Sequence, residues 1–148
     1  MLHTITSLEE LQTLAREIAA KLSAGEVILL SGDLGSGKTT FVQQLARALG
    51  VTEDVTSPTF TIVGEYEIPE HSTLKWLVHI DLYRVPGEEE NVDSEYLKEV
   101  ITTAKENKRI VAIEWPERLP NILPKKAWKM QFSPGKDKNQ RIITVTEP

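Results

Sequence analysis

The sequence predicts an α/β sandwich, in which helices cover both faces of a mixed β-sheet. Two observations support this fold class. Short apolar runs typical of buried strands alternate with amphipathic helical segments, and a glycine-rich loop joins one such strand directly to a helix. The 148 residues contain neither an internal repeat nor a low-complexity linker. We therefore expect a single domain over residues 1–148, long enough to bury a core of its own.

The first helix is predicted to begin after Ser7, which has the spacing of a capping box with Glu10. Apolar residues then recur at helical spacing until Gly25 ends the pattern. Residues 27–31 follow as a short apolar run typical of a strand, and residues 40–49 again show helical spacing. This second helix is expected to end at Gly50 with a left-handed cap.

The loop between this strand and the second helix matches the pattern G-x-x-x-x-G-K-[ST] at every fixed position. It consists of Gly32, Asp33, Leu34, Gly35, Ser36, Gly37, Lys38 and Thr39. Glycines let backbone N–H groups curl around a phosphate, and the helix directs its positive end toward it. Lys38 is expected to reach the outer phosphates, and the Thr39 hydroxyl to face Mg²⁺. Because a strand precedes the loop and a helix follows it, we favour a nucleoside triphosphate site over an ordinary glycine-rich turn.

The middle of the chain adds two strands, a helix and another strand. Residues 59–68 and 74–81 are β-rich runs separated by a polar turn, which predicts neighbouring antiparallel strands. Residues 85–93 contain proline, glycine and a run of glutamates, and so indicate a loop or the beginning of a helix. Residues 94–106 show helical spacing, and residues 109–115 form a further apolar strand.

The end of the chain differs from the rest in charge. Residues 127–132 and 141–146 flank a turn-rich connection, which suits a hairpin. Residues 118–148 hold 7 Lys and Arg against 2 Asp and Glu, whereas residues 1–117 hold 10 against 20, and the whole chain has a net charge of −5. The basic residues are spread over strands and a turn, so a solvated face explains them better than a nucleic-acid site.

The composition bounds the class of protein. With 40% hydrophobic and 26% charged residues, the chain resembles an ordinary soluble globular protein. It has no cysteine, which excludes a disulfide framework and a thiolate metal site. No apolar run approaches the length of a membrane span, and the first residues lack the pattern of a signal peptide. We therefore expect a cytoplasmic protein without a membrane partner.

Two acidic residues at strand ends are candidates for the chemistry beside the phosphate loop. Phosphoryl transfer requires a carboxylate near Mg²⁺ and a group that places the attacking water. Asp81 and Glu114 each close an apolar run, and the carboxyl ends of parallel strands meet at one edge of a sheet. Either could be the metal-binding acid on spacing alone, and either could instead cap a neighbouring helix. His79 shares a strand face with Asp81, although a lone histidine there is more often packed than catalytic.

A hydroxyl-bearing segment follows the second helix. Ser57, Pro58 and Thr59 occupy the place of a switch segment in many nucleotide hydrolases, but an ordinary turn into a strand would look the same. Arg84 could supply positive charge in a transition state or pair with a carboxylate, and we favour pairing. Trp115 is expected in the core.

Four blocks of sequence, in this order in a short chain, resemble the TsaE (YjeE) family over roughly residues 5–146. They are the phosphate loop continued through Thr40 and Phe41, SPTFTI at residues 57–62, HIDLYR at residues 79–84 and IEWPERL at residues 113–119. Early in the first helix, where relatives usually have a threonine, this chain has Leu11. This family is the ATPase component of bacterial tRNA N6-threonylcarbamoyladenosine synthesis at adenosine 37. Its members work with TsaB and TsaD, which carry the transfer chemistry.

The resemblance implies a P-loop NTPase-like three-layer sandwich that binds ATP and Mg²⁺. It implies weak ATP hydrolysis by the chain alone, activity within a complex with TsaB- and TsaD-like proteins, and tRNA contact made mainly through that complex. Asp81 would be the carboxylate needed for hydrolysis, and Lys38 would be a second catalytic residue, which holds the phosphates. Thr39 and Glu114 would ligate Mg²⁺. The nucleotide-binding residues would be Gly32, Leu34, Gly35, Ser36, Gly37, Lys38, Thr39 and Thr40. The two switch segments would be formed by Ser57, Pro58 and Thr59 and by residues 79–84, which include His79.

Two other functions remain open. A small-molecule P-loop kinase would need an arginine-rich lid, but the arginines beyond the first half of the chain are scattered, at positions 84, 109, 118 and 141. A non-catalytic, nucleotide-gated scaffold would use ATP only to order the switch segments. A GTPase is disfavoured because no Asn-Lys-x-Asp element is present; residues 107–110 fail at the last position.

Overall fold

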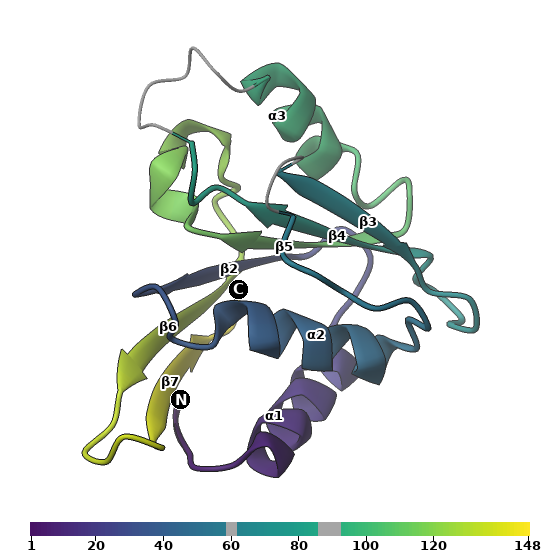
Figure 1. The fold of residues 1–148 in the computed structure, drawn as a ribbon. Helices are drawn as coiled ribbons and strands as arrows, with labels where there is room; N and C mark the ends of the chain where they lie inside the picture. Colours follow the sequence, from purple (N-terminus) through teal and green to yellow (C-terminus); the bar gives the residue numbers. More distant parts are fainter. Residues whose placement is uncertain (59–61, 86–92) are drawn as a thin grey trace.

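The computed structural model describes residues 1–58, 62–85 and 93–148. These residues form one seven-stranded sheet with helices on both faces (Figure 1). The predicted α/β sandwich on a mixed sheet is therefore confirmed. The elements in chain order are β1 (Leu2–Ile5), α1 (Leu8–Lys21), β2 (Val27–Gly32), α2 (Lys38–Leu49), β3 (Val63–Glu67), β4 (Trp76–Asp81), α3 (Ser94–Thr102), β5 (Arg109–Glu114), the 3₁₀ turns η2 (Pro116–Arg118) and η3 (Pro120–Ile122), β6 (Trp128–Pro134) and β7 (Arg141–Thr146).

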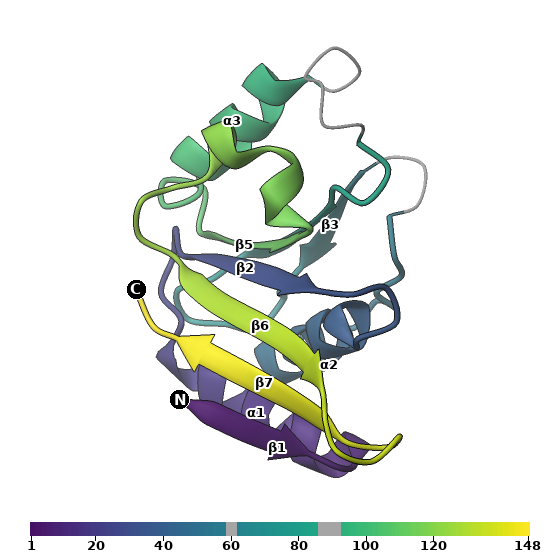
Figure 2. The ribbon, with the colours of Figure 1, turned by 90° about the vertical axis from the view of Figure 1, so that its left-hand side faces the viewer.

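The sheet has a parallel centre and antiparallel edges. Its strand order is β1-β7-β6-β2-β5-β4-β3, and the pairs β6–β2, β2–β5 and β5–β4 are parallel. The two predicted hairpins, β3–β4 and β6–β7, are antiparallel. Strand β1 was not expected from the sequence; it lies beside β7, from the opposite end of the chain (Figure 2). Its four residues hold only two apolar side chains, so the pairing with β7 defines this strand more than its own pattern does.

The first helix begins where the sequence predicts. The Ser7 hydroxyl oxygen accepts a hydrogen bond from the Glu10 N–H at 3.1 Å. In a capping box the Glu10 carboxylate would accept from the backbone N–H of Ser7. Here it accepts instead from the backbone N–H and the hydroxyl of Thr6, one residue earlier in the chain. At the end of the second helix, Gly50 has φ 97°, the predicted left-handed cap.

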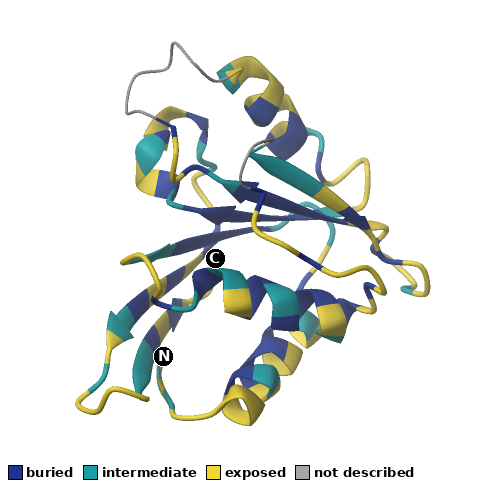
Figure 3. Cartoon of the chain, in the orientation of Figure 1, coloured by how far each residue is buried: buried dark blue, intermediate teal, exposed yellow. Residues whose placement is uncertain are grey.

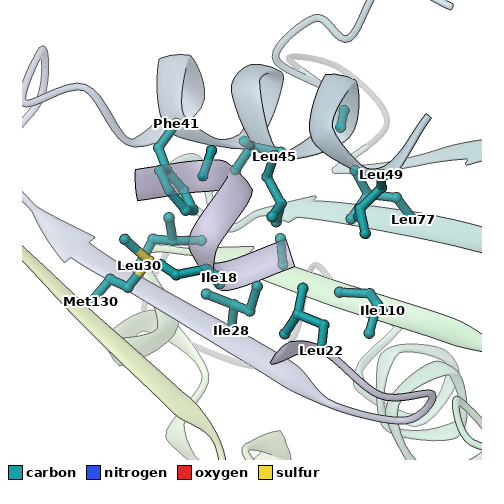
Figure 4. Close-up of a cluster of buried hydrophobic side chains, with 14 of the residues drawn as sticks. Ile18, Leu22, Ile28, Leu30, Phe41, Leu45, Leu49, Leu77, Ile110 and Met130 are labelled. Carbon is teal, nitrogen blue, oxygen red and sulfur yellow. The ribbon is translucent and has the colours of Figure 1, made fainter. Parts of the chain in front are cut away.

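Two buried clusters sandwich the sheet. One lies between the sheet and helices α1 and α2, where Phe41 of α2 points toward Leu30 of β2 and Leu49 of α2 points toward Leu77 of β4 (Figure 4). The other lies under α3 and the 3₁₀ turns. Because β2, β4 and β5 are covered on both faces, they are buried along most of their length, whereas the helices expose their outer sides (Figure 3). This explains why these strands are apolar runs rather than alternating patterns.

Some element boundaries differ from the sequence-based expectation. Strand β3 begins at Val63 rather than at residue 59, and residues 59–61 lie outside the described part of the chain. Most of the loop expected at residues 85–93 lies outside it as well. Helix α3 ends at Thr102 instead of residue 106, because residues 103–108 turn back toward β5, with Lys108 in a left-handed conformation at φ 54°. The apolar spacing of the sequence extends past the end of the helix because Ala104, in this turn, is also buried.

This topology places three strand ends at one edge of the sheet. The carboxyl ends of β2, β4 and β5 lie side by side, since Leu30 pairs with Glu114 and Glu114 pairs with Asp81. Helix α2 begins at the same edge, directly after the phosphate loop. Within the described ranges, no helix has both the length and the apolar character needed to cross a bilayer.

Candidate functional site

The phosphate loop requires glycine at two positions for different reasons. Gly32 ends β2, and a Cβ there would lie 2.8 Å from both the Phe132 carbonyl oxygen and the Ser36 hydroxyl. Gly37 precedes the first residue of α2 and has φ 105°, a left-handed conformation that residues with a Cβ rarely adopt. The loop thus brings its backbone close to neighbouring groups and turns sharply into the helix, as the motif predicts.

Lys38 points back across the loop. Its Nζ donates to the carbonyl oxygens of Gly32 at 2.5 Å and Asp33 at 2.9 Å, and lies 4.3 Å from the centre of the Trp115 ring. Burial lowers the pKa of Lys38, while the nearby carboxylates of Glu114 and Asp81 oppose that shift. Since its hydrogen bonds go to neutral groups, the charge of Lys38 remains available to a phosphate.

Thr39 and Glu114 meet at the foot of the loop. The Thr39 hydroxyl lies 3.0 Å from Glu114 Oε1 and 2.9 Å from Oε2. Glu114 is only 2% exposed, yet it carries a carboxylate at the end of a central strand. Hydroxyl and carboxylate oxygens suit Mg²⁺, which in nucleotide sites takes few protein ligands and completes its shell with phosphates and water. Among the described residues, no group of three or more His, Cys, Asp and Glu side chains is placed to hold a metal ion.

Asp81 is the neighbour of Glu114 on the next strand, but it is only partly buried. Its Oδ2 accepts from the Ser57 hydroxyl at 3.1 Å, and its Oδ1 accepts from the Tyr83 N–H at 3.0 Å. The sequence-predicted switch residue Ser57 is thus brought to the strand-end acid. Pro58 lies close by, whereas Thr59 lies outside the described residues.

His79 lies inside β4 and is fully buried. Its Nε2 is 2.5 Å from Glu114 Oε2. The residue is therefore packed, as a lone histidine on a strand face was expected to be, and it is also bonded to the candidate metal ligand. That contact places it beneath the site, on the carboxylate, and not at the cavity surface.

A cavity of about 300 Å³ joins these groups. Its lining comes from the phosphate loop, the segment after α2 and the ends of β4 and β5, and comprises Leu34, Gly35, Ser36, Gly37, Lys38, Thr39, Thr40, Ser57, Pro58, Ile62, Asp81, Tyr83, Arg84, Glu114 and Trp115. Every nucleotide-binding residue expected from the motif lines it, apart from Gly32. Arg84, which was expected to pair with a carboxylate, is one of the residues that line this cavity.

Trp115 corrects the sequence-based expectation of a core residue. Its side chain is only partly buried: it packs against the cluster under α3, but its ring also lines the cavity and lies over Lys38. Its backbone is left-handed, at φ 58°. Tyr83, whose ring centre lies 5.1 Å from that of Trp115, was not singled out from the sequence as a cavity residue. The signal that could have found both is their position, one and two residues beyond the strand-end acids.

A second cavity, of about 460 Å³, lies on the other side of the loop. It shares Gly35, Ser36, Gly37 and Thr40 with the first. The rest of its lining comes from both ends of the chain, namely Ile5, Thr6, Ser7, Leu8, Leu11, Phe132, Lys138, Asn139, Arg141 and Ile143. Sequence reasoning missed this cavity because its walls are brought together only by the pairing of β1 with β7.

Comparisons with known proteins identify the family to which this chain is similar. The family model described as "Threonylcarbamoyl adenosine biosynthesis protein TsaE" matches residues 5–143. The "tRNA threonylcarbamoyladenosine biosynthesis protein TsaE" of Aquifex aeolicus is 47% identical over 116 residues, which cover 77% of this chain and 75% of that protein. The protein of the same name from Bacillus subtilis is 34% identical over 139 residues, which cover 93% and 80%.

Two cyanobacterial relatives of that name are longer. The Synechocystis protein is 44% identical over 72% of this chain, and the Nostoc protein is 48% identical over 67% of it. The matches span only 64% and 57% of those two proteins, less than two thirds of their length.

The fold also has a solved counterpart. A crystal structure of Bacillus subtilis YdiB aligns with 99% of this chain and 84% of its own, with a TM-score of 0.76 and 29% sequence identity. Together with the loop between β2 and α2, this likeness confirms the expected P-loop NTPase-like fold.

Proposed function

Because the chain belongs to the TsaE family, whose members are named for threonylcarbamoyladenosine biosynthesis in tRNA, we propose that it binds and hydrolyses ATP with Mg²⁺ in support of that modification. The observation that carries the proposal is the contact between Thr39 and Glu114 beside the phosphate loop. A loop of this type needs an acid at this position to hold the metal of a nucleoside triphosphate. Strand β5 supplies this acid at its end, and the neighbouring strand β2 leads into the loop and helix α2, which carries Thr39.

The two cavities suit the two halves of a nucleotide. The phosphates would lie in the first cavity, on the N–H groups of the loop and the positive end of α2, with Lys38 as the counter-charge. The base and ribose would lie in the second cavity, which combines the apolar side chains of Leu11, Phe132 and Ile143 with polar groups of the β6–β7 hairpin. The loop residues that line both cavities would then lie beneath the middle of the nucleotide, between its ribose and its outer phosphates.

Thr39 and Glu114 would hold Mg²⁺. When bound, the ion supplies charge neutralisation for the outer phosphates. The Thr39 oxygen retains a lone pair while its hydrogen is donated to Glu114, so the observed hydrogen bond is compatible with ligation.

Asp81 would place the attacking water. Each of its oxygens already accepts one hydrogen bond, from Ser57 or Tyr83, and these bonds fix the carboxylate at the cavity wall with acceptor capacity left over. The water oxygen would form a bond to the γ-phosphorus while the bond to ADP breaks, and the water proton would be released toward Asp81. Lys38 would stabilise the negative charge on the phosphate oxygens.

The family assignment extends the proposal to partners. TsaB- and TsaD-like proteins would carry the transfer chemistry, and tRNA would be bound mainly through that complex in the cytoplasm. The basic residues near the end of the chain would contribute little to tRNA binding on their own.

The test is ATP hydrolysis by the purified chain with and without TsaB and TsaD. We expect weak hydrolysis alone and a clear rise with the partners. Asp81→Asn should lower the rate by roughly 10²–10⁴-fold, since it removes a proton acceptor, and should leave ATP binding in place. Asp54→Asn, at an exposed aspartate outside both cavities, is the matched control.

Two outcomes would count against the proposal in different ways. Hydrolysis that is unaffected by both the partners and Asp81→Asn would contradict the enzymatic role. Threonylcarbamoyladenosine formation that survives Asp81→Asn, although hydrolysis is lost, would favour the nucleotide-gated scaffold instead.

A further inference from the structure

We propose that His79 is a positioning residue for the metal site, and that its Nε2–H fixes the rotation of the Glu114 carboxylate. The inference rests on the proposed binding of ATP with Mg²⁺ and deepens it. It concerns a side chain that lies beneath the nucleotide cavity and lines none of its surface. The resemblance implied a switch role for this residue, whereas its contacts point to a fixed support.

The strand register brings the imidazole to the carboxylate. In the parallel pair β4–β5, Asp81 is opposite Glu114 and His79 is opposite Ala112. Side chains two residues apart on a strand share a face, so His79 and Glu114 both project toward α2. The residue at position 112 is alanine, and its small side chain leaves space on this face for the imidazole to reach diagonally across β5.

The hydrogen bonds show which group sets the carboxylate's orientation. Thr39 has one hydroxyl proton and lies almost equally far from the two oxygens of Glu114, 3.0 Å from Oε1 and 2.9 Å from Oε2. It therefore does not distinguish them. His79 contacts Oε2 at 2.5 Å. An ionised carboxylate only accepts, so Nε2 donates in the tautomer that carries its proton on that nitrogen.

The rest of the imidazole is held by packing. Its Nδ1 is buried and has no hydrogen-bond partner among the described residues. Among the described residues, the hydrogen bond between Nε2 and Glu114 is therefore the one polar contact of the ring. Glu114 itself is 2% exposed, so water does not readily replace a lost donor there.

A carboxylate held at Oε2 keeps Glu114 and Thr39 in a constant arrangement at the cavity wall, which both residues line. Such supporting contacts commonly account for a 10- to 100-fold difference in metal affinity or activity. If His79 only filled space, any side chain of similar size that packed well would serve equally. The two readings differ in whether a donor at the position of Nε2 is required.

The test compares His79→Gln with His79→Asn. The amide nitrogen of glutamine reaches about as far along the side chain as Nε2, whereas that of asparagine reaches only as far as Nδ1. Both variants are neutral amides, so they differ mainly in whether a donor reaches Glu114. Val78→Ala, on the opposite face of β4, is the control for lost packing.

The readout is the Mg²⁺ concentration that gives half of the metal-dependent rise in melting temperature at saturating ATP. We expect His79→Asn to raise this concentration by roughly 10- to 100-fold. His79→Gln and Val78→Ala should stay near the wild-type value, even where their melting temperatures fall. Stabilisation by ATP in EDTA should be similar in all variants, because the phosphate loop is unchanged.

An unchanged Mg²⁺ requirement in His79→Asn would overturn the inference and leave the proposed function standing. A wild-type chain whose stability does not respond to ATP with Mg²⁺ would instead contradict the proposed function itself. If His79→Asn does not fold, NMR of the wild-type protein tests the inference instead. The His79 Nε2–H resonance should shift when Mg²⁺ is added to the ATP-bound chain, and a resonance that does not move would overturn the inference.

Discussion

The carboxylates of Glu114 and Asp81 lie side by side at the ends of β5 and β4, yet their surroundings differ. Glu114 is buried and bonded to Thr39 and His79, whereas Asp81 is partly exposed and bonded to Ser57 and to a backbone N–H. Neighbouring carboxylates in different environments commonly take different roles in one reaction. The buried acid suits a metal ligand, and the exposed acid suits a contact with water.

At the residue scale, the sequence locates side chains of the candidate site where the motif is local. The positions of Lys38 and Thr39 follow from the pattern of the loop itself. Spacing alone could not choose between Asp81 and Glu114, because the choice depends on the contact with Thr39, 75 residues away from Glu114. The position of Trp115 directly after Glu114 indicates the edge of the site, but it does not show that the ring lies over Lys38, because that contact depends on the left-handed backbone of Trp115.

The hydroxyl of Thr39 provides the sharpest test at this scale. Thr39→Val removes the hydroxyl and keeps the shape, whereas Thr39→Ser keeps the hydroxyl. We expect Thr39→Val to weaken ATP binding in Mg²⁺ by at least about tenfold, because the metal would lose one of its two proposed protein ligands. Thr39→Ser should bind much as the wild type does.

Calorimetric titration with ATP, in Mg²⁺ and in EDTA, measures this effect. The difference between the two variants should vanish in EDTA. Equal binding by Thr39→Val and Thr39→Ser in Mg²⁺ would show that the hydroxyl has no part in the metal site.

At the scale of elements, the long periodic segments and the hairpins were predicted well, and the short or irregular ones were not. Helix α1 and strand β2 carry their own patterns and stop signals. Strand β1 has no such pattern, and the end of α3 is set by the turn into β5. The first miss occurs where a contact distant in sequence defines a strand, and the second where a local turn ends a helix before its apolar spacing does.

The cap of α3 gives a prediction for this scale. The Asp93 carboxylate accepts from the Tyr96 N–H at 3.0 Å, which satisfies one of the free donors at the start of the helix. Asp93→Ala should lower the free energy of unfolding by about 1 kcal/mol, whereas Asp93→Asn, which keeps an acceptor, should retain most of the stability. Urea denaturation of the two variants measures the difference.

Nucleotide binding should be unaffected by either change, since Asp93 lines neither the cavity beside Glu114 nor the one beside Leu11. If Asp93→Ala and Asp93→Asn were equally stable, the hydrogen bond to Tyr96 would contribute nothing to the fold.

At the scale of the whole molecule, the sheet gathers the site from distant parts of the chain. The phosphate loop comes from the first third of the sequence, the two acids from its middle and later parts, and the second cavity from both ends. The fold class and the phosphate side of the site could be predicted because one local motif and the rule for parallel strand ends define them. The second cavity, which we propose for the nucleoside, could not be predicted, because it depends on the docking of β1 against β7.

The central claim is that this edge of the sheet is an ATP–Mg²⁺ site, and thermal unfolding tests it most directly. A ligand that binds only the folded chain raises its stability, by about 2.7 kcal/mol at a free concentration one hundred times the Kd. We predict a higher melting temperature with ATP and Mg²⁺, a smaller rise with GTP and Mg²⁺, and a loss of the metal-dependent part in Thr39→Val. A melting temperature that neither nucleotide raises would contradict the account.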